Sequence, residues 1–201
     1  MLNFPDTPTS YYDWPASPYG VIWASSVPFR ILPYIQDNVL RGHTTVTVGP
    51  KHDGSPNHNR IACDMQNVKS IYALWTAANG WESYQNVQFE NRRIGNLELT
   101  FADGPPMSLP VILGQNIREW IYHNAAPQGQ GVVNTLSDRA VSQAWHSLED
   151  LHTLDMIQII IKDPPRHLRA IELVGAFEFA TTIPGEYLPH FRASALTCEL
   201  A

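Results

Sequence analysis

Residues 94–120 read IGNLELTFADGPPMSLPVILGQNIREW, and apolar and polar side chains alternate in two runs on either side of a central break. Alternation with a period of two is the mark of a strand that buries one face. The break, residues 102–106, contains Asp-Gly, which favours a tight turn, and two prolines, which cannot donate to a strand ladder. The stretch therefore predicts a β-hairpin, and residues 117–122 after it are predicted as one short helical turn. The alternating apolar positions are Leu97, Leu99 and Phe101 before the break and Leu109, Val111 and Leu113 after it.

The rest of the chain carries further strand patterns and almost no helical periodicity. Residues 44–48 are β-branched, and residues 68–77 are almost continuously apolar, as in a strand covered on both faces. The 16 prolines and 12 glycines divide the chain into short segments. About eight or nine strands joined by turns predict an all-β fold, an antiparallel β-sandwich or jelly roll. The other predicted strands are residues 27–31, 140–145, 154–161, 168–174 and 191–200.

The N-terminal residues differ in character from those that follow. Residues 1–26 are rich in Pro, Ser and aromatic residues without a helical period, so we interpret them as an irregular arm. Residues 27–201 are predicted to form one β-sandwich domain, because a chain of this size suits a single core. The aromatic side chains of the arm are expected to pack on the domain surface, since aromatic residues bury large areas. A ligand platform is the alternative for these residues, which are Tyr11, Tyr12, Trp14, Tyr19 and Trp23.

Composition argues against several classes of protein. Apolar residues make up 44% and charged residues 16% of the chain, which is typical of a folded globule. The net charge of −6 and the lack of a Lys/Arg cluster argue against nucleic acid as a partner, because phosphate binding needs cationic contacts. No apolar run approaches the roughly 20 residues of a membrane span, and residues 1–12 lack the pattern of a signal peptide.

The cysteines and the loop histidines carry little functional signal. Cys63 and Cys198 each lie in an apolar–polar alternation, which favours buried free thiols, with a disulfide in an oxidising compartment as the alternative. Residues 49–60 are predicted as a long polar loop, in which His52 and His58 have no third metal ligand close by in the sequence. We therefore expect no metal site in this loop.

The motifs of common enzyme classes are missing from the sequence. It contains no Gly-x-Ser-x-Gly nucleophile elbow, no His-Glu-x-x-His zinc helix and no phosphate-binding loop. We therefore predict no catalytic residues. A glycan-acting hydrolase with an unrecognised carboxylate pair is an alternative, because such enzymes need two facing acids. The acids that could form the pair include Asp64, Glu82, Asp103 and Glu119.

Short motifs in a fixed order carry a family resemblance. They are VPF at 27–29, IYALWTA at 71–77, FADG at 101–104, GQNIREW at 114–120 and ALT at 195–197. In these motifs the chain resembles the galactose-binding-like β-sandwich domains that are appended to bacterial glycoside hydrolases and other secreted polysaccharide-handling proteins. The resemblance covers most of the chain and implies a non-catalytic, carbohydrate-associated role and an extracellular location. The chain departs from the family at Trp75 and Phe101, where members tend to carry His and Tyr.

A sugar site needs an exposed aromatic face for stacking and polar groups that fix the orientation of the ligand. The segment with Trp81 and Tyr84 follows a strand and lies among polar residues, so it is the first candidate, with loop packing as the alternative. Asn116 and Arg118 would supply hydrogen bonds to the sugar. Trp120 is either a further ligand contact or an anchor of the core.

Two acids are candidates for other contacts. Asp103 either shapes its turn or touches a ligand or a metal. The resemblance implies no cofactor other than an optional structural calcium ion, to which Glu199 would contribute. Calcium needs roughly six or more oxygen ligands, and the sequence shows no convincing set.

The leading prediction is therefore a non-catalytic carbohydrate-binding module for a polysaccharide or an oligosaccharide. It would act alone, as a homo-oligomer or fused to a catalytic domain. The first alternative is a structural or assembly module that uses residues 1–26 to pack on a protein partner. The second alternative is the hydrolase described above.

Overall fold

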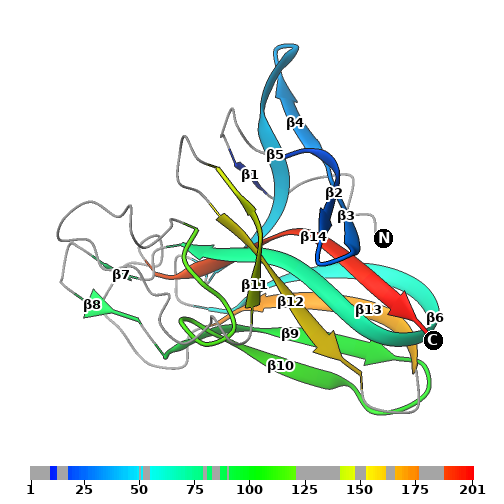
Figure 1. Ribbon diagram of the computed structural model, residues 1–201. Helices are drawn as coiled ribbons and strands as arrows, with labels where there is room; N and C mark the ends of the chain where they lie inside the picture. The colour runs from blue at the N-terminus through cyan, green and yellow to red at the C-terminus, as the bar shows by residue number, and fades with distance from the viewer. Residues whose placement is uncertain are drawn as a thin grey trace.

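The computed structural model describes residues 10–12, 18–49, 51, 55–78, 81–82, 87–89, 91–120, 141–147, 153–161, 166–176 and 188–201. The regular elements in these ranges are β-strands, and most of them join one curled antiparallel sheet (Figure 1). The all-β, antiparallel class predicted from the sequence is confirmed. Within the same ranges, no helix has the length and apolar character that a membrane crossing requires.

The main sheet follows the order β1-β5-β14-β6-β13-β9-β10. β4 adds to β5, and β12 adds to β6 and carries β11, while β2–β3 and β7–β8 form separate two-stranded ribbons. The bounds are β1 Ser10–Tyr12, β2 Gly20–Ala24, β3 Val27–Ile31, β4 Pro33–Gln36, β5 Val39–Val48, β6 Asn57–Ala78, β7 Trp81–Glu82, β8 Val87–Gln88, β9 Arg93–Phe101, β10 Met107–Ile112, β11 Val141–His146, β12 Thr153–Ile160, β13 Arg166–Gly175 and β14 His190–Leu200.

The long strand β6 connects two parts of the sheet. Its first half, residues 57–68, pairs with β13, which also pairs with β9. In its second half, residues 70–75 pair with β12 on one edge and with β14 on the other. We call the first half of β6 with β13, β9 and β10 the β9 part, and the second half with β12, β11, β14 and β5 the β14 part.

A bulge at Asn67 separates the two halves of β6. Asn67 has a φ of 57°, and the pairing registers of β13 and β14 both shift near this residue. A bulge bends a strand and increases its twist, and Asn tolerates the left-handed conformation better than most residues. The bend allows one strand of 22 residues to run from one part of the sheet into the other.

The main hydrophobic core collects side chains from both parts of the sheet. Leu97 and Leu99 of β9 belong to the same buried cluster as Ile71 and Trp75 of β6 and Phe191 of β14. The rings of Trp75 and Phe191 meet edge to face, with centroids 6.1 Å apart and planes at 82°, which is a favoured aromatic geometry. A core enclosed by one curled sheet is consistent with the β-sandwich class, whereas jelly-roll connectivity stays a prediction.

The hairpin predicted within residues 94–113 is confirmed as β9 and β10. Leu99 pairs with Met107, and Leu97 pairs with Leu109. Leu97 and Leu99 are fully buried, so the period of two in the sequence identified the inward face correctly.

Glycine at position 95 permits the close approach of β9 to its neighbours. A Cβ atom there would lie 2.1 Å from the carbonyl oxygen of Val174 in β13 and 2.6 Å from Cε1 of Phe191 in β14. Both distances are far shorter than a van der Waals contact, so the added atom would clash, and the backbone oxygen cannot move aside. Gly95 is therefore required by packing rather than by a turn.

The β2–β3 hairpin covers the opposite face of the β14 part. Phe29 and Ile31 of β3 are fully buried there, in a second and smaller hydrophobic cluster. The Oγ1 of Thr197 in β14 donates a hydrogen bond of 2.6 Å to the carbonyl of Pro28 and so ties the hairpin to the sheet. The other buried members of this cluster are Ala24, Leu74, Leu154, Met156 and Ala195.

The hairpin joins the predicted arm to the predicted domain. Its first strand, β2, belongs to residues 1–26, and its second strand begins at Val27. The turn residues Ser25 and Ser26 have φ angles of 47° and 69°, the signs of a two-residue type I′ turn. Within the arm, β1 and β2 are regular strands, while residues 1–9 and 13–17 lie outside the described part of the chain.

Asn67 offers a test of the bend in β6. We expect Asn67→Val to lower the free energy of unfolding by about 1–2 kcal/mol, because a β-branched residue is strained at positive φ. Asn67→Gly is the matched control and should change stability by less than about 1 kcal/mol. Urea denaturation of the three proteins measures both effects, and a Val variant as stable as the Gly variant would contradict the role of the bulge.

Two histidines with lowered pKa values, the buried His43 and the half-buried His190, make the fold sensitive to acid. Burial, with the charge of Arg192 as the second cause, lowers the pKa of His43 from 6.5 to about 3. The Nε2 of His43 lies 2.9 Å from the hydroxyl of Ser194, between β5 and β14. Burial and Arg192 also lower the pKa of His190 to about 4. Both side chains are therefore neutral in the folded protein at pH values where the unfolded chain already binds protons.

This difference predicts a pH dependence of stability. Below pH 6.5 the histidine at position 43 binds a proton in the unfolded state but not in the folded state. As the pH is lowered from 6.5 toward the folded-state pKa, the free energy of unfolding should therefore decrease by up to about 1.4 kcal/mol per pH unit. In His43→Gln the slope between pH 6.5 and 4 should be shallower, whatever the absolute stability of the variant. Urea midpoints across this range measure the slope, and equal slopes would refute the assignment.

Candidate functional site

The first predicted sugar-binding segment lies largely outside the described residues. Trp81 and Glu82 form β7, in which Trp81 pairs with Gln88 of β8. Tyr84 falls outside the described ranges, as do the side chains of β7. Ligand contact by Trp81 and Tyr84 therefore stays a prediction.

Asn116 is held by backbone groups of the preceding strand. Its Oδ1 accepts a hydrogen bond of 2.8 Å from the N–H of Ile112, and its Nδ2 donates one of 2.8 Å to the carbonyl of Pro110. Together these bonds fix the turn that follows β10. The Asn116 side-chain amide therefore stabilises the backbone of this turn.

Arg118 forms an ion pair inside the molecule. Its Nε donates a hydrogen bond of 2.7 Å to Oδ2 of Asp155 in β12, and its Nη2 contacts Oδ1 of the same carboxylate. The side chain of Asp155 is 0% exposed and that of Arg118 12% exposed. This bidentate contact compensates the charge of the Asp155 carboxylate, which would otherwise be costly to bury.

The segment 117–120 is extended, so the predicted helical turn is wrong over these residues. The N–H of Ala77 donates to the carbonyl of Arg118 at 2.8 Å, and the N–H of Trp120 donates to the carbonyl of Ala77 at 2.9 Å. The carbonyl of Trp120 in turn accepts the N–H of Thr153. These bonds bridge the end of β6 to the start of β12, with Trp120 half-buried and Glu119 buried.

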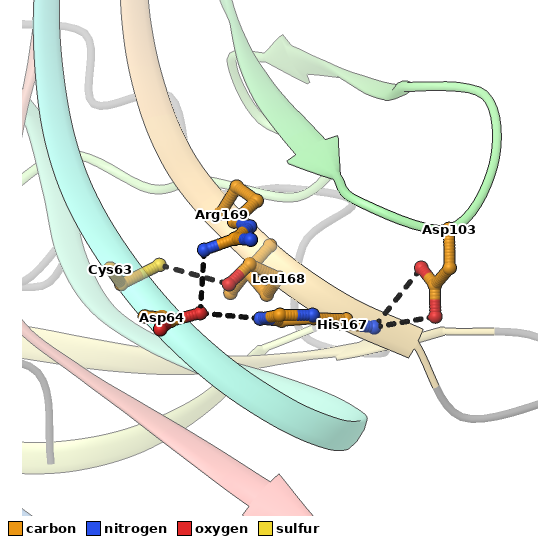
Figure 2. A network of polar contacts seen from close by, with 6 residues as sticks. All are labelled: Cys63, Asp64, Asp103, His167, Leu168 and Arg169. Atoms are coloured by element: carbon orange, nitrogen blue, oxygen red, sulfur yellow. Dashed lines mark hydrogen bonds and ion pairs between the residues drawn. The ribbon is translucent and has the colours of Figure 1, made fainter.

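Asp103 links the β9–β10 turn to β13. Both of its carboxylate oxygens accept the backbone N–H of His167, at 3.1 and 2.9 Å (Figure 2). The Nε of Arg166 lies 3.8 Å from Oδ1 of Asp103. The same guanidinium sits 3.7 Å above the ring of Phe101 and donates to the carbonyl of Pro105 at 2.6 Å. Asp103 therefore anchors its turn to the neighbouring strand.

A second acid shares this neighbourhood. Asp64 of β6 accepts hydrogen bonds from Nε2 of His167 and, at 2.8 Å, from Nη1 of Arg169 (Figure 2). The hydrogen bond from His167 is the main cause that lowers the pKa of the Asp64 carboxyl, and the Arg169 charge adds to it. Cys63 beside it is a free thiol that donates to the carbonyl of Leu168 at 3.8 Å, and Cys198 is also free.

The carboxylates considered for hydrolysis are placed very differently from one another. Asp64 and Asp103 both contact His167, one at the ring and the other at the backbone. Glu119 is buried, and the side chain of Glu82 lies outside the described ranges. Where the chain is described, no three or more His, Cys, Asp or Glu side chains group as a metal site would require.

The outward face of the β2–β3 hairpin is the apolar surface that stands out. Trp23 is 67% exposed and Val21 on the same strand is 54% exposed, although their neighbour Ile22 points toward the core. Tyr19, directly before β2, is 56% exposed. The packing expected for Tyr19 and Trp23 is therefore wrong, and the ligand platform is the alternative that suits their exposure.

Polar partners are available on the same face. The pairing register places Pro28 opposite Trp23 and the exposed Arg30 opposite Val21. We call the exposed residues Tyr19, Val21, Trp23 and Arg30, together with the half-buried Pro28, the outer hairpin face. It combines an indole, a phenol and a guanidinium in one place.

Two hollows flank the turn of this hairpin. The larger, of about 520 Å³, lies beside β3 and β14, and we call it the Glu199 hollow. The smaller, of about 320 Å³, lies toward β11 and β12, and we call it the Gln158 hollow. Ser25, Val27 and Tyr72 line both, so they form the wall between them.

A chain of hydrogen bonds crosses this wall. The hydroxyl of Tyr72 donates to Oε2 of Glu199 at 3.0 Å and accepts from Nε2 of Gln158 at 2.9 Å. Nζ of Lys69 donates to Oε1 of Glu199 at 3.3 Å. The bond from Tyr72, followed by that from Lys69, lowers the pKa of the Glu199 carboxyl, while burial and Glu199 raise the pKa of Tyr72.

Comparisons with protein-family models, curated proteins and solved structures gave no match for this chain. The site is therefore judged on its own geometry. Of the residues predicted from the sequence, Asn116, Arg118 and Asp103 have structural contacts, while Tyr72, Gln158 and the turn serines were not predicted.

The buried Arg118–Asp155 pair gives a stability prediction. Arg118→Met leaves the Asp155 carboxylate buried without its main countercharge, so we expect a loss of about 3–5 kcal/mol in the free energy of unfolding. Asp155→Leu should cost a similar amount by stranding the guanidinium. The double variant should lose less than the sum of the two, and strictly additive losses in urea denaturation would contradict a coupled pair.

Proposed function

We propose that this chain is a non-catalytic glycan-binding module whose ligand stacks on the outer hairpin face. The observation that carries the proposal is the exposure of Trp23, 67%, on a strand whose opposite face packs against the core through Ile22 and Ala24. Exposure of a large apolar side chain to water is unfavourable, and contact with a ligand would remove that apolar surface from water.

The chemistry of this face suits a sugar better than a purely apolar ligand. Sugar rings have one face of C–H groups, which stacks on an aromatic plane, and a rim of hydroxyl groups, which need hydrogen-bond partners. Trp23 and Tyr19 offer the aromatic planes, and Arg30 offers several N–H donors beside them. Aromatic rings also lose little conformational entropy on binding.

The hairpin is rigid enough to act as a platform. Phe29 and Ile31 are fully buried beneath it, and Thr197 holds the carbonyl of Pro28 at 2.6 Å. A ligand therefore meets a surface whose backbone is already ordered, which lowers the entropic cost of binding.

Trp23→Ala tests the proposal directly. We expect affinity for the bound polysaccharide to fall by about tenfold or more, because truncating a central aromatic contact typically costs about 2 kcal/mol. Stability should change by less than about 0.5 kcal/mol, since the side chain is exposed. Retention on a panel of galactan, xylan, cellulose, mannan and chitin measures binding, and circular dichroism checks the fold.

Ile160→Ala is the matched control for this experiment. Ile160 is 63% exposed but lies on β12, which contributes no residue to the outer hairpin face, so its loss should leave retention unchanged. Binding that survives Trp23→Ala, or no binding to any member of the panel, would overturn the proposal. The second of these results would favour the protein-partner alternative, and release of soluble sugars from the panel would favour the hydrolase.

A further inference from the structure

The Glu199 hollow continues the outer hairpin face. Its lining includes Pro28, which lies directly opposite Trp23 in the β2–β3 pair. A chain stacked on Trp23 therefore reaches the mouth of the hollow by crossing one residue. The full lining is Ser25, Ser26, Val27, Pro28, Tyr72, Thr197, Cys198 and Glu199.

The hollow has the mixed character of a site for a polyhydroxylated ring. Val27 and Pro28 supply an apolar side, while the hydroxyls of Ser25, Ser26 and Tyr72 and the carboxylate of Glu199 supply polar groups. Its volume of about 520 Å³ exceeds what one sugar ring fills and lies within the usual range of small-molecule sites. The polar groups are thus gathered in a space of suitable size.

The carboxylate is held in position before any ligand arrives. Tyr72 donates to one oxygen of Glu199 at 3.0 Å and Lys69 donates to the other at 3.3 Å. A carboxylate offers about four acceptor positions, so the bonds from Tyr72 and Lys69, with Ser70 as a further partner, leave capacity for a hydroxyl group of a ligand. Gln158 steadies Tyr72 from the far side at 2.9 Å.

The turn that forms the rim is unusual in composition. Type I′ turns favour Asn-Gly because both central residues have positive φ, yet here both are serines, at 47° and 69°. Serine in this conformation costs backbone energy that glycine would avoid. What serine adds is a hydroxyl group at each position, and both residues line the hollow.

We propose that the Glu199 hollow is the subsite for the terminal sugar of a neutral glycan chain, with Glu199 and the turn serines accepting and donating hydrogen bonds to its hydroxyl groups. This inference rests on the proposed function, because the rest of the chain would lie on Trp23. The Lys69 ammonium offsets part of the charge of Glu199, and the remaining repulsion from this carboxylate, with the net charge of −6, disfavours the carboxylate of a uronic acid.

Chemical-shift mapping with monosaccharides tests the subsite separately from the platform. Galactose, glucose and xylose, and galacturonic and glucuronic acid, are each titrated into ¹⁵N-labelled protein. At least one neutral sugar should shift the amides of Ser25, Ser26 and Cys198, and the uronic acids should bind at least about tenfold more weakly, as expected when a bond to a charged acceptor is replaced by repulsion.

Three variants sharpen the result. Glu199→Gln should lower the affinity for the neutral sugar by about tenfold and reduce the ratio of the affinities for neutral sugars and uronic acids, because the charge is removed while the shape of the side chain is kept. Ser26→Gly should bind more weakly yet unfold at higher urea, since it loses a hydroxyl and relieves positive φ. Glu98→Gln is the control, because Glu98 also accepts a hydroxyl hydrogen bond, from Ser108 at 2.8 Å, but lies in the β9 part.

The outcomes separate this inference from the proposed function. If polysaccharide retention depends on Trp23 but no monosaccharide shifts the amides of the hollow, the subsite is refuted and the glycan-binding function stands. If Glu199→Gln binds neutral sugars and uronic acids as the wild type does, the role of the carboxylate is refuted. If neither the panel nor the monosaccharides bind, both proposals fall.

Discussion

The continuity of β6 is the constraint on which the rest of this structure depends. Because one strand serves both parts of the sheet, β12, β13 and β14 all find their register on the same backbone. The bulge at Asn67 turns the strand, so that Ile71 and Trp75 can join Leu97 and Leu99 in one core. The outer face of the second half of β6 is then left for the β2–β3 hairpin, whose far side is the candidate binding surface.

The sequence predicted the parts of the fold that depend on local periodicity. The alternation around Leu97 and Leu99 placed β9 correctly, and the apolar run at residues 68–77 indicated a strand covered on both faces. Residues 57–67 were missed, because a polar loop was predicted up to Arg60 and a bulge has no clear signature in one sequence. Residues 117–120 are extended rather than helical because their backbone bonds to Ala77, a distant residue, and such a non-local contact leaves no pattern in the local sequence.

The candidate site was less predictable, for physical reasons that particular residues illustrate. Arg118 and Asp155 are 37 positions apart, so nothing local announces that they neutralise each other. Tyr72 was hidden in an apolar run, and its hydroxyl matters only through partners on β12 and β14. The exposure of Trp23 follows from a hairpin whose Ser-Ser turn lacks the usual Asn-Gly signal. Composition could identify the aromatic residues but not the side of the ribbon on which each one lies.

The position of β14 has a consequence for synthesis in the cell. This strand lies between β5 and β6, yet the ribosome makes its residues, 190–200, long after those of both neighbours. At roughly 5–20 residues per second, the gap between residues 78 and 190 lasts on the order of ten seconds. During that interval β5 and the second half of β6 present apolar strands with unpaired edges to the cytosol or to a translocation channel. A nascent chain of this topology should therefore depend on holdase chaperones until its last strand arrives.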